Sequence, residues 1–484
     1  MEIRRSSGAT TVWTQRDQIQ AYQFLRRRLI SALVTADANH PASPSRRLVL
    51  GTILGVAAAV LTAAAFGVIG LLNPSGAADW RQGGQVIVER ETGARYVLGQ
   101  DGLLHPVLNY ASARLLAGGN ADTTVTVSSS SLGSASRGAM LGIPGAPDSL
   151  PASGSLSDNT FASCTRTPPD LPAAAQPVST VILSGAALTG HSLPVGQALF
   201  VTPSSGGEFL LTAGHRFRLT GAAAAALGYE DVPPTPVADS WLDTVPAGRD
   251  LAPLAVPDAG APGPTIGGTP TLVGQVLGDG SYYLVQADGV APIGATEARL
   301  VLGDSANIAA YPNGRPSVVR LSVAALAGAA RAPVTPQTGP ADYPRSLPTV
   351  ATIGPNAVVC AVGDGTDDSA IVAATRLPLP QGAAVMRVGE RADDRVADEV
   401  YVPPGSGTLV RERVGSGGGT GAMYLITDAG TKYPVPSQDA AAALGYAGVT
   451  PKQVAGTLLA LLPTGPSLDP VAARQVVVAS GGGR

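Results

Sequence analysis

A run of 25 residues without a charged side chain, at positions 48–72, constrains this chain of 484 residues more than any other feature. An α-helix rises 1.5 Å per residue, so the run reaches about 37 Å, enough to cross the roughly 30 Å core of a bilayer. A cleaved signal peptide is the alternative, but it begins near the N-terminus and has a shorter apolar core. Because 47 residues precede the run, the sequence predicts a single-pass membrane anchor.

Charge is unevenly distributed on the two sides of this run. Residues 1–47 carry eight arginines and three acidic residues, a net charge of +5, and the rest of the chain carries −8. Positively charged flanks of membrane helices remain in the cytoplasm. We therefore expect residues 1–47 in the cytoplasm and residues 73–484 as an extracytoplasmic region, called here the ectodomain. The overall charge of −3 argues against general nucleic-acid binding.

The cytoplasmic segment predicts a basic amphipathic helix over residues 14–34. Thr14 and Asp17 resemble a capping box with Asp in place of Glu. A helix of this length does not fold alone, so its apolar face needs a cover. Anionic lipid and a cytoplasmic partner are both compatible with this face. Its apolar residues recur at steps of three or four: Ile19, Tyr22, Leu25, Leu29 and Leu33.

The ectodomain contains a repeated pattern. Four stretches, which begin at Tyr96, Phe209, Tyr283 and Tyr424, each read as a short apolar strand, a tight glycine turn and a second apolar strand. Such a pattern predicts a β-hairpin, and a helical segment follows each one. The spacings of 113, 74 and 141 residues between these aromatics are too irregular for a simple solenoid.

The four hairpins are of two kinds. The sequence ARL-x-x-G follows the first and third, at 113–118 and 298–303, and ALGY follows the second and fourth. Residues 226–253 and 443–470, which contain the two ALGY sequences, are identical at 13 of 28 positions. We therefore predict four small hairpin-plus-helix repeats.

Two long segments rich in Ser, Pro and Gly, 119–195 and 331–404, separate the repeats, and each contains one of the two cysteines. An oxidising compartment favours a disulfide between Cys164 and Cys360. Two buried free thiols are the alternative. We infer that the two segments meet in a central core clamped by this disulfide, with the repeats around it. The predicted fold class is thus α+β, mainly β.

Several long stretches resemble the EccB family, a membrane component of the actinobacterial type VII (ESX) secretion system. The resemblance covers nearly the whole chain. One departure is Phe161, because the family often has Trp near the first cysteine. Besides the single membrane span and the cysteine pair, the matching stretches are residues 20–34 (QAYQFLRRRLISALV), 90–115, 142–151 (GIPGAPDSLP), 433–446 and 458–473.

The resemblance implies a structural and assembly subunit of a hexameric inner-membrane machine, with an elongated periplasmic ectodomain. The implied partners are the EccC motor ATPase, EccD, EccE, other EccB copies and, outside, a mycosin protease. The resulting domains are 1–47 (cytoplasmic region), 48–72 (transmembrane helix), 73–118 (repeat 1), 119–195 (core), 196–256 (repeat 2), 257–330 (repeat 3), 331–404 (core) and 405–484 (repeat 4 and tail).

Members of the family are sometimes labelled ATPases, so nucleotide hydrolysis is an alternative function. A phosphate-binding loop has the pattern G-x-x-x-x-G-K-S/T, and this chain contains no Gly-Lys pair. The glycine-rich stretch 415–421 is followed by Ala, Met and Tyr, and we interpret it as a flexible linker. The sequence thus predicts no catalytic residues and no cofactor, with ATP implied only by the family label.

The histidines and one cluster of aspartates are the candidate metal ligands of this chain. His40, His105, His191 and His215 lack metal-ligand spacing. The cluster of Asp364, Asp367 and Asp368 is either a calcium site or, as we favour, a solvated acidic turn.

A peptidoglycan-binding anchor is the other alternative function. The four repeat aromatics at 96, 209, 283 and 424 would then be sugar platforms rather than core residues.

Overall fold

The computed structural model describes residues 14–35, 44–72, 80–118, 124–156, 161–167, 178–185, 191–333, 343–354, 357–364, 369–388, 395–414 and 419–477. The chain forms two compact units, Met1–Asp79 and Trp80–Arg484, and each is described by itself.

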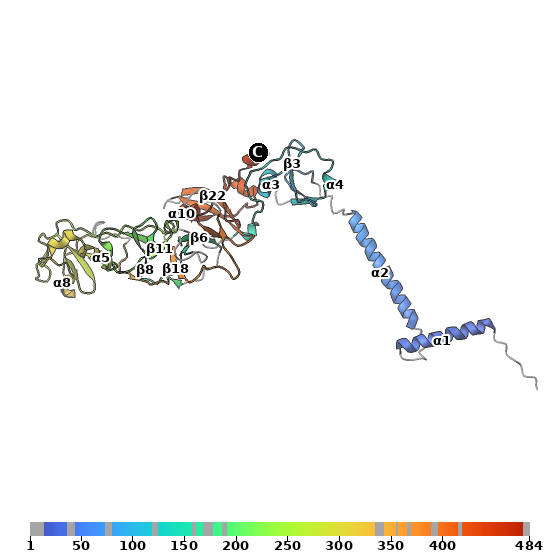
Figure 1. Ribbon diagram of the computed structural model, residues 1–484, viewed down its shortest axis with the longest axis horizontal. Helices are drawn as coiled ribbons and strands as arrows, with labels where there is room; N and C mark the ends of the chain where they lie inside the picture. The colour runs from blue at the N-terminus through green and yellow to red at the C-terminus, as the bar shows by residue number, and fades with distance from the viewer. Residues whose placement is uncertain are drawn as a thin grey trace, which may run out of the picture. The chain divides into compact units, whose positions relative to one another are not determined.

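The described residues of the first unit form two helices (Figure 1). The carboxylate of Asp17 accepts hydrogen bonds from the backbone N–H and the hydroxyl of Thr14, at 3.1 and 2.6 Å, at the start of α1 (Gln15–Thr35). The second helix, α2 (Pro44–Leu72), starts at a proline, whose fixed φ suits a first helical turn. Its segment Val49–Val68 is long and apolar enough to cross a membrane, judged by length and composition.

Four separate sheets in the second unit, called sheets 1 to 4, share one order of four strands, and sheet 2 has a fifth strand in addition. In each, the hairpin is flanked by an antiparallel strand that precedes it in sequence. A later strand then pairs in parallel with that preceding strand. All four predicted hairpins lie at the expected residues.

The strands of sheets 1 and 2 are β1 (Val86–Glu89), β2 (Arg95–Leu98), β3 (Leu104–Pro106) and β4 (Thr124–Val127), then β8 (Gln197–Pro203), β9 (Glu208–Thr212), β10 (His215–Leu219) and β11 (Thr235–Val237). Those of sheets 3 and 4 are β12 (Val276–Gly278), β13 (Tyr282–Gln286), β14 (Gly289–Ile293) and β15 (Val319–Arg320), then β21 (Gly407–Val414), β22 (Gly419–Thr427), β23 (Lys432–Val435) and β24 (Lys452–Ala455). A short strand, β16 (Thr349–Val350), also pairs with β8.

The helices repeat the division into two kinds. The hairpins of sheets 1 and 3 are followed by eight-residue helices, α3 (Tyr110–Ala117) and α7 (Ala295–Leu302). The hairpins of sheets 2 and 4 are followed by α5 (Ala223–Leu227) and α9 (Gln438–Ala443). Shorter helical turns are α4 (Ser129–Leu132), α6 (Asp239–Leu242), α8 (Val323–Ala327), α10 (Gly456–Ala460), α11 (Pro470–Ala473) and two 3-10 turns at Ser153–Ser155 and Ser305–Ala310.

A seven-stranded sheet, called the central sheet, has the order β19-β20-β6-β5-β17-β18-β7. Every strand of this sheet comes from one of the two segments in which the sequence analysis places the core. The strands are β5 (Phe161–Arg166), β6 (Ser179–Ser184), β7 (His191–Ser192), β17 (Val358–Val362), β18 (Ala370–Ala374), β19 (Met386–Arg387) and β20 (Glu399–Tyr401).

Two details differ from the sequence analysis. Strand β4 lies inside the predicted core segment 119–195, but it completes sheet 1 by pairing in parallel with β1. The interpretation of 415–421 as a linker is wrong for Gly419–Gly421, because these residues begin β22. A Cβ at Gly421 would lie 2.5 Å from the carbonyl oxygen of Glu412, so the close approach of β21 and β22 there requires glycine.

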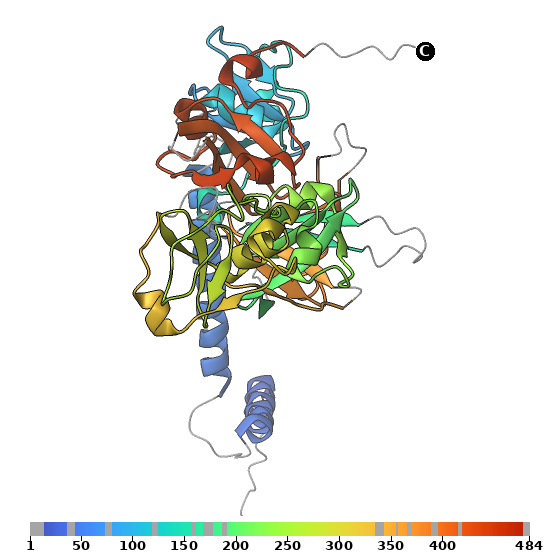
Figure 2. The ribbon, with the colours of Figure 1, turned by 90° about the vertical axis from the view of Figure 1, so that its left-hand side faces the viewer.

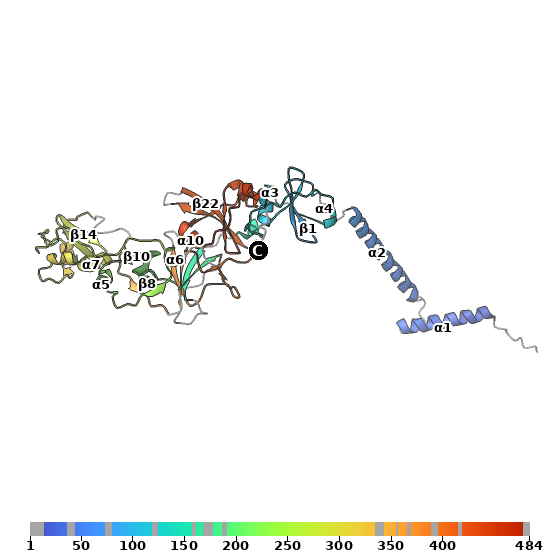
Figure 3. The same cartoon turned by 45° about the horizontal axis from the view of Figure 1, so that its top comes forward.

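The sheets pair out of sequence order. Side chains of α3 pack with residues of sheet 4 in one hydrophobic cluster, which includes Leu115 and Tyr446. Side chains of sheet 2 pack with α7 of sheet 3 in another, which includes Tyr229 and Leu300. Figures 1, 2 and 3 accordingly draw the light-blue and red segments side by side, and the green beside the yellow. The first repeat therefore completes its core with the last, and the second with the third.

Candidate functional site

The centre of the second unit is a disulfide between Cys164 and Cys360. The two cysteines face each other directly across the antiparallel pair of β5 and β17, with their Cα atoms 4.0 Å apart. Both are buried, in a cluster that includes Val181, Leu183 and Tyr401. The bond thus joins two strands 196 positions apart in the chain.

The opposite face of β5 holds sheet 2. Successive side chains of a strand point to opposite faces, so Ser163 lies behind the disulfide. The Nε1–H group of Trp241 donates a 2.9 Å hydrogen bond to the carbonyl oxygen of Ser163. The hydroxyls of Ser163 and Thr244 lie 2.6 Å apart, and the amide of Ala238 donates to the hydroxyl oxygen of Thr165. The small helix α6 of sheet 2 is therefore fixed to the central sheet by buried polar contacts.

Sheet 4 is held to the central sheet in another way. Phe161, Val400 and Leu458 belong to a hydrophobic cluster that the two sheets share. The Lys452 ammonium lies 3.3 Å from a carboxylate oxygen of Asp364, whose backbone carbonyl accepts from the amide of Ala455. Asp364 therefore forms a structural contact, and Asp367 and Asp368 lie outside the described residues.

Within the central sheet, Arg166 and Glu399 form an ion pair of 2.5 Å between two largely buried side chains. The pair connects β5 to β20 across β6. Together with the disulfide, it fixes strands from both core segments in one sheet.

The pair formed by sheets 1 and 4 and the pair formed by sheets 2 and 3 contain the same hydrogen bond, from a tyrosine hydroxyl to a proline carbonyl. The hydroxyl of Tyr446 donates a 2.9 Å hydrogen bond to the carbonyl oxygen of Pro151, and that of Tyr229 donates a 2.5 Å bond to Pro348. Each tyrosine ends an ALGY sequence and each proline ends a Ser-Leu-Pro sequence. Burial raises the pKa of Tyr446, and it raises that of Tyr229 to about 12.

The Ser-Leu-Pro repeat was missed by the sequence analysis. Two of its copies, at 147–151 and 344–348, have the longer pattern Pro-x-Ser-Leu-Pro and lie 197 positions apart, almost the separation of the two cysteines. A third Ser-Leu-Pro, at 192–194, lacks the first proline. This common spacing was the available signal that the ectodomain consists of two similar halves, each with its own hairpins, Ser-Leu-Pro sequence and cysteine.

The predicted apolar face of α1 is exposed in the described part of the first unit. Ile19 is 57% exposed and Leu33 is 82% exposed. Tyr22, Leu25 and Leu29 are exposed as well. A face of this kind is a binding surface, because so many adjacent apolar side chains are costly to leave in water.

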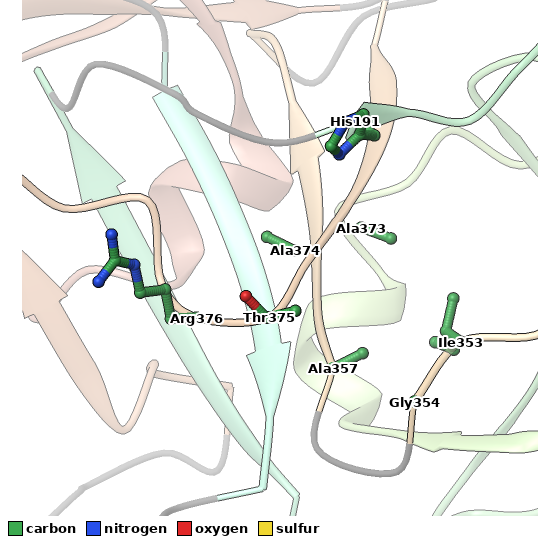
Figure 4. Close-up of a pocket in the computed structure, with 8 residues that line it drawn as sticks. All are labelled: His191, Ile353, Gly354, Ala357, Ala373, Ala374, Thr375 and Arg376. Atoms are coloured by element: carbon green, nitrogen blue, oxygen red, sulfur yellow. The ribbon is translucent and has the colours of Figure 1, made fainter.

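A shallow pocket of about 340 Å³ lies at the β7 edge of the central sheet (Figure 4). Its lining includes His191 and Arg376, but most of it is small and apolar, with three alanines. Figure 4 shows the Arg376 side chain pointing away from Ile353 and Gly354. The pocket does not bring catalytic groups together.

The other histidines serve local contacts. His105 contacts the carbonyl oxygen of Ala139 through Nδ1 and the carboxylate of Asp101 through Nε2, at 2.8 and 3.1 Å. His215 contacts the carbonyl oxygen of Ala213, and His40 lies outside the described residues. Among the residues that the structure describes, no cluster of His, Cys, Asp or Glu could hold a metal ion.

The repeat aromatics pack within their own sheets. Tyr96 is buried, and Phe209, Tyr283 and Tyr424 are half-buried beside hydrophobic clusters. A guanidinium lies 4.5 Å from the ring centroid of Tyr96 and another lies 4.9 Å from that of Tyr283. These contacts favour a packing role for the aromatics.

Lys432 and Lys452 are the only lysines of the chain. The ammonium of Lys432 donates to the carbonyl oxygens of Leu459 and Leu462, at 2.5 and 2.7 Å, next to the end of α10. Burial lowers the pKa of Lys432 to about 8. Both lysines therefore hold sheet 4 and its surroundings together.

Comparison with known proteins gives the class of this molecule. A family model described as "Type VII secretion system ESX-1, transport TM domain B" matches residues 11–479. The fold and the uncovered apolar surfaces thus belong to a transmembrane component of a type VII secretion system. The chain belongs to the EccB family.

Relatives and solved structures agree over nearly the whole length. The chain is 29% identical to the "ESX-5 secretion system ATPase EccB5" of Mycobacterium tuberculosis H37Rv, over 96% of this chain and 94% of that protein. A chain in the structure of an intact ESX-5 inner membrane complex is 27% identical, with a TM-score of 0.67 over 99% of this chain and 98% of that one. The EccB3 dimer from the ESX-3 core complex matches 81% of this chain and 99% of that chain, with 26% identity and a TM-score of 0.63.

Proposed function

We propose that this protein is an assembly subunit of a type VII secretion machine in the inner membrane. The observation that carries the proposal is the match of almost the entire chain to a chain inside an intact ESX-5 inner membrane complex.

The proposed topology is a single pass with the N-terminus in the cytoplasm. The eight arginines of 1–47 support this orientation, because basic flanks are retained on the cytoplasmic side. The disulfide supports an oxidising location for the ectodomain. The repeats, proposed to number four, would then mediate contacts in the periplasm.

The proposed partners follow the family. The exposed face of α1 would dock on cytoplasmic subunits, with EccC, EccD and EccE as the candidates. The ectodomain would contact other copies of this chain and a mycosin protease. The EccB3 dimer from the ESX-3 core complex supports contacts between copies.

A test of the docking role uses the full chain in native membranes. The triple variant Ile19→Ser, Leu29→Ser and Leu33→Ser removes apolar contacts from an exposed face, so the ectodomain still folds. We expect loss of copurification with the other subunits. The matched control is Gln18→Ser with Gln23→Ser, which alters exposed polar positions of the same helix. Full copurification of the triple variant would contradict the proposal.

ATP hydrolysis is not part of the proposal, although the relatives' printed names contain the word ATPase. A phosphate-binding loop places a lysine against the phosphates. In this chain Lys432 donates to backbone carbonyls and Lys452 contacts Asp364. No residue of the motif can therefore be assigned here.

A further inference from the structure

The pairs formed by sheets 1 and 4 and by sheets 2 and 3 differ at one place. A pocket of about 500 Å³ lies where α5 of sheet 2 meets sheet 3, and Ala226, Ala295 and Leu347 are among its lining residues. Ala295 is the first residue of α7. The corresponding first residue of α3 is Tyr110. The two pairs thus differ by an aromatic ring at an equivalent position.

The register of the strands shows which other positions of sheets 1 and 3 correspond to each other. Val125 lies opposite Ile87 in sheet 1, as Val319 lies opposite Leu277 in sheet 3. Thr124, the residue before Val125, therefore corresponds to Val318. Arg95, the residue before Tyr96, corresponds in the same way to Tyr282.

Tyr110 is in contact with those same positions in sheet 1. Its hydroxyl lies 3.4 Å from the hydroxyl of Thr124, and the guanidinium of Arg95 lies 5.9 Å from its ring centroid. The corresponding residues in sheet 3, Val318 and Tyr282, line the pocket. The pocket therefore occupies the place that a tyrosine ring takes in the other pair.

A positive charge completes the pocket. Arg299 is one of the lining residues and is exposed, whereas its counterpart Arg114 is buried and donates to the carbonyl oxygen of Ala443. An exposed guanidinium beside a hollow that also presents apolar side chains, among them Leu302 and Val318, favours a ligand that combines a ring with an anionic group.

We propose that this pocket is a docking site for an aromatic side chain that a partner protein presents next to a carboxylate. The partner's ring takes the position of the absent tyrosine, and Arg299 pairs with the carboxylate. The identification of the partner as a subunit of the machine rests on the proposed function. The inference that the pocket can hold such a ring does not depend on the proposed function.

Binding is tested on the detergent-solubilised full chain by saturation-transfer NMR. The probes are 4-hydroxyphenylacetate, p-cresol, which lacks the carboxylate, and cyclohexylacetate, which lacks the aromatic ring. We expect 4-hydroxyphenylacetate to bind best. Ala295→Tyr, which fills the pocket as in the other pair, abolishes binding, while the matched control Ala295→Ser retains it. Arg299→Gln weakens binding of 4-hydroxyphenylacetate by about tenfold and leaves p-cresol unchanged.

Docking is tested on the native membrane complex. Ala295→Tyr should reduce the yield of copurified subunits while the chain melts at the same or a higher temperature, and Ala295→Ser should not. Absence of probe binding, probe binding that Ala295→Tyr leaves intact, or an unchanged yield of the complex would each overturn the docking site. The proposed function would stand in those cases, because the α1 variants test it separately.

Discussion

Tyr446 donates a hydrogen bond of 2.9 Å to the carbonyl oxygen of Pro151, which precedes it by 295 positions. The contact joins the last repeat to the segment that follows sheet 1. Tyr229 and Pro348 form the same contact in the other pair. The same polar contact therefore accompanies the shared hydrophobic cluster in each pair of sheets.

Replacement of this tyrosine should destabilise the ectodomain. Tyr446→Phe leaves the buried carbonyl of Pro151 without its partner, and we expect a loss of about 1–2 kcal/mol in the free energy of unfolding. Tyr229→Phe should cost a similar amount, because its hydroxyl is equally engaged. Calorimetry of the purified chain measures both. Tyr22→Phe, on the exposed face of α1, is the control and should have no effect.

Loss of the disulfide should loosen the central sheet more than any repeat. In Cys164→Ser the loop of 196 positions is no longer closed. We expect a loss of roughly 2–5 kcal/mol, with about 5 kcal/mol as the upper figure of the chain-entropy model. Hydrogen exchange should increase first in β5 and β17. An unchanged melting temperature would show that the sheet does not depend on the bond.

Stability should increase with pH above about 8 because of Lys432. Its folded pKa of about 8 lies below the ordinary lysine pKa of 10.5, which applies to the unfolded chain. Between these values the unfolded chain binds more protons, so stability rises with pH by up to about 3 kcal/mol. Below pH 8 both states are protonated and the contribution is constant. The neutral amine retains two hydrogens for the carbonyl oxygens of Leu459 and Leu462.

Lys432→Met is the comparison for this pH dependence. The difference in melting temperature between the two proteins should change from pH 8 to 10 and be flat from pH 6 to 8. A difference that stays constant across the whole range would mean that the lysine keeps its charge in the folded chain.

The proposed topology predicts the result of limited proteolysis. Protease added to intact protoplasts should remove the region after α2 and leave 1–47 protected. Antibodies against each end of the chain would measure this. Digestion of the N-terminal end with protection of the C-terminal region would reverse the orientation.

Much of the local structure could be predicted from the sequence, because its signals are short in range. Asp101-Gly102 and Asp288-Gly289 are strong turn pairs, and the hairpins lie there. The composition of the two cysteine-containing segments also indicated where the central sheet forms. The face of α1 was evident from its helical period.

The choice of partners between repeats could not be predicted. Hydrophobic periodicity indicates which face of a helix or strand is buried, but it does not indicate which other element packs against that face. Leu115 and Leu300 occupy the same place in the ARL-x-x-G pattern, yet one packs with sheet 4 and the other with sheet 2. The pocket at Ala295 could not be predicted either, because it forms where segments that are distant in the sequence meet.

The pairing of the first repeat with the last sets an order of events during synthesis. The first repeat is synthesised early, but the residues that cover its helix, among them Tyr446 and Ala473, are synthesised much later. Until those residues are present, the apolar face of α3 is exposed, and an exposed apolar surface favours aggregation or chaperone binding. A chain that ends a few dozen residues too soon would therefore leave the first repeat without its cover, in addition to losing part of the last repeat.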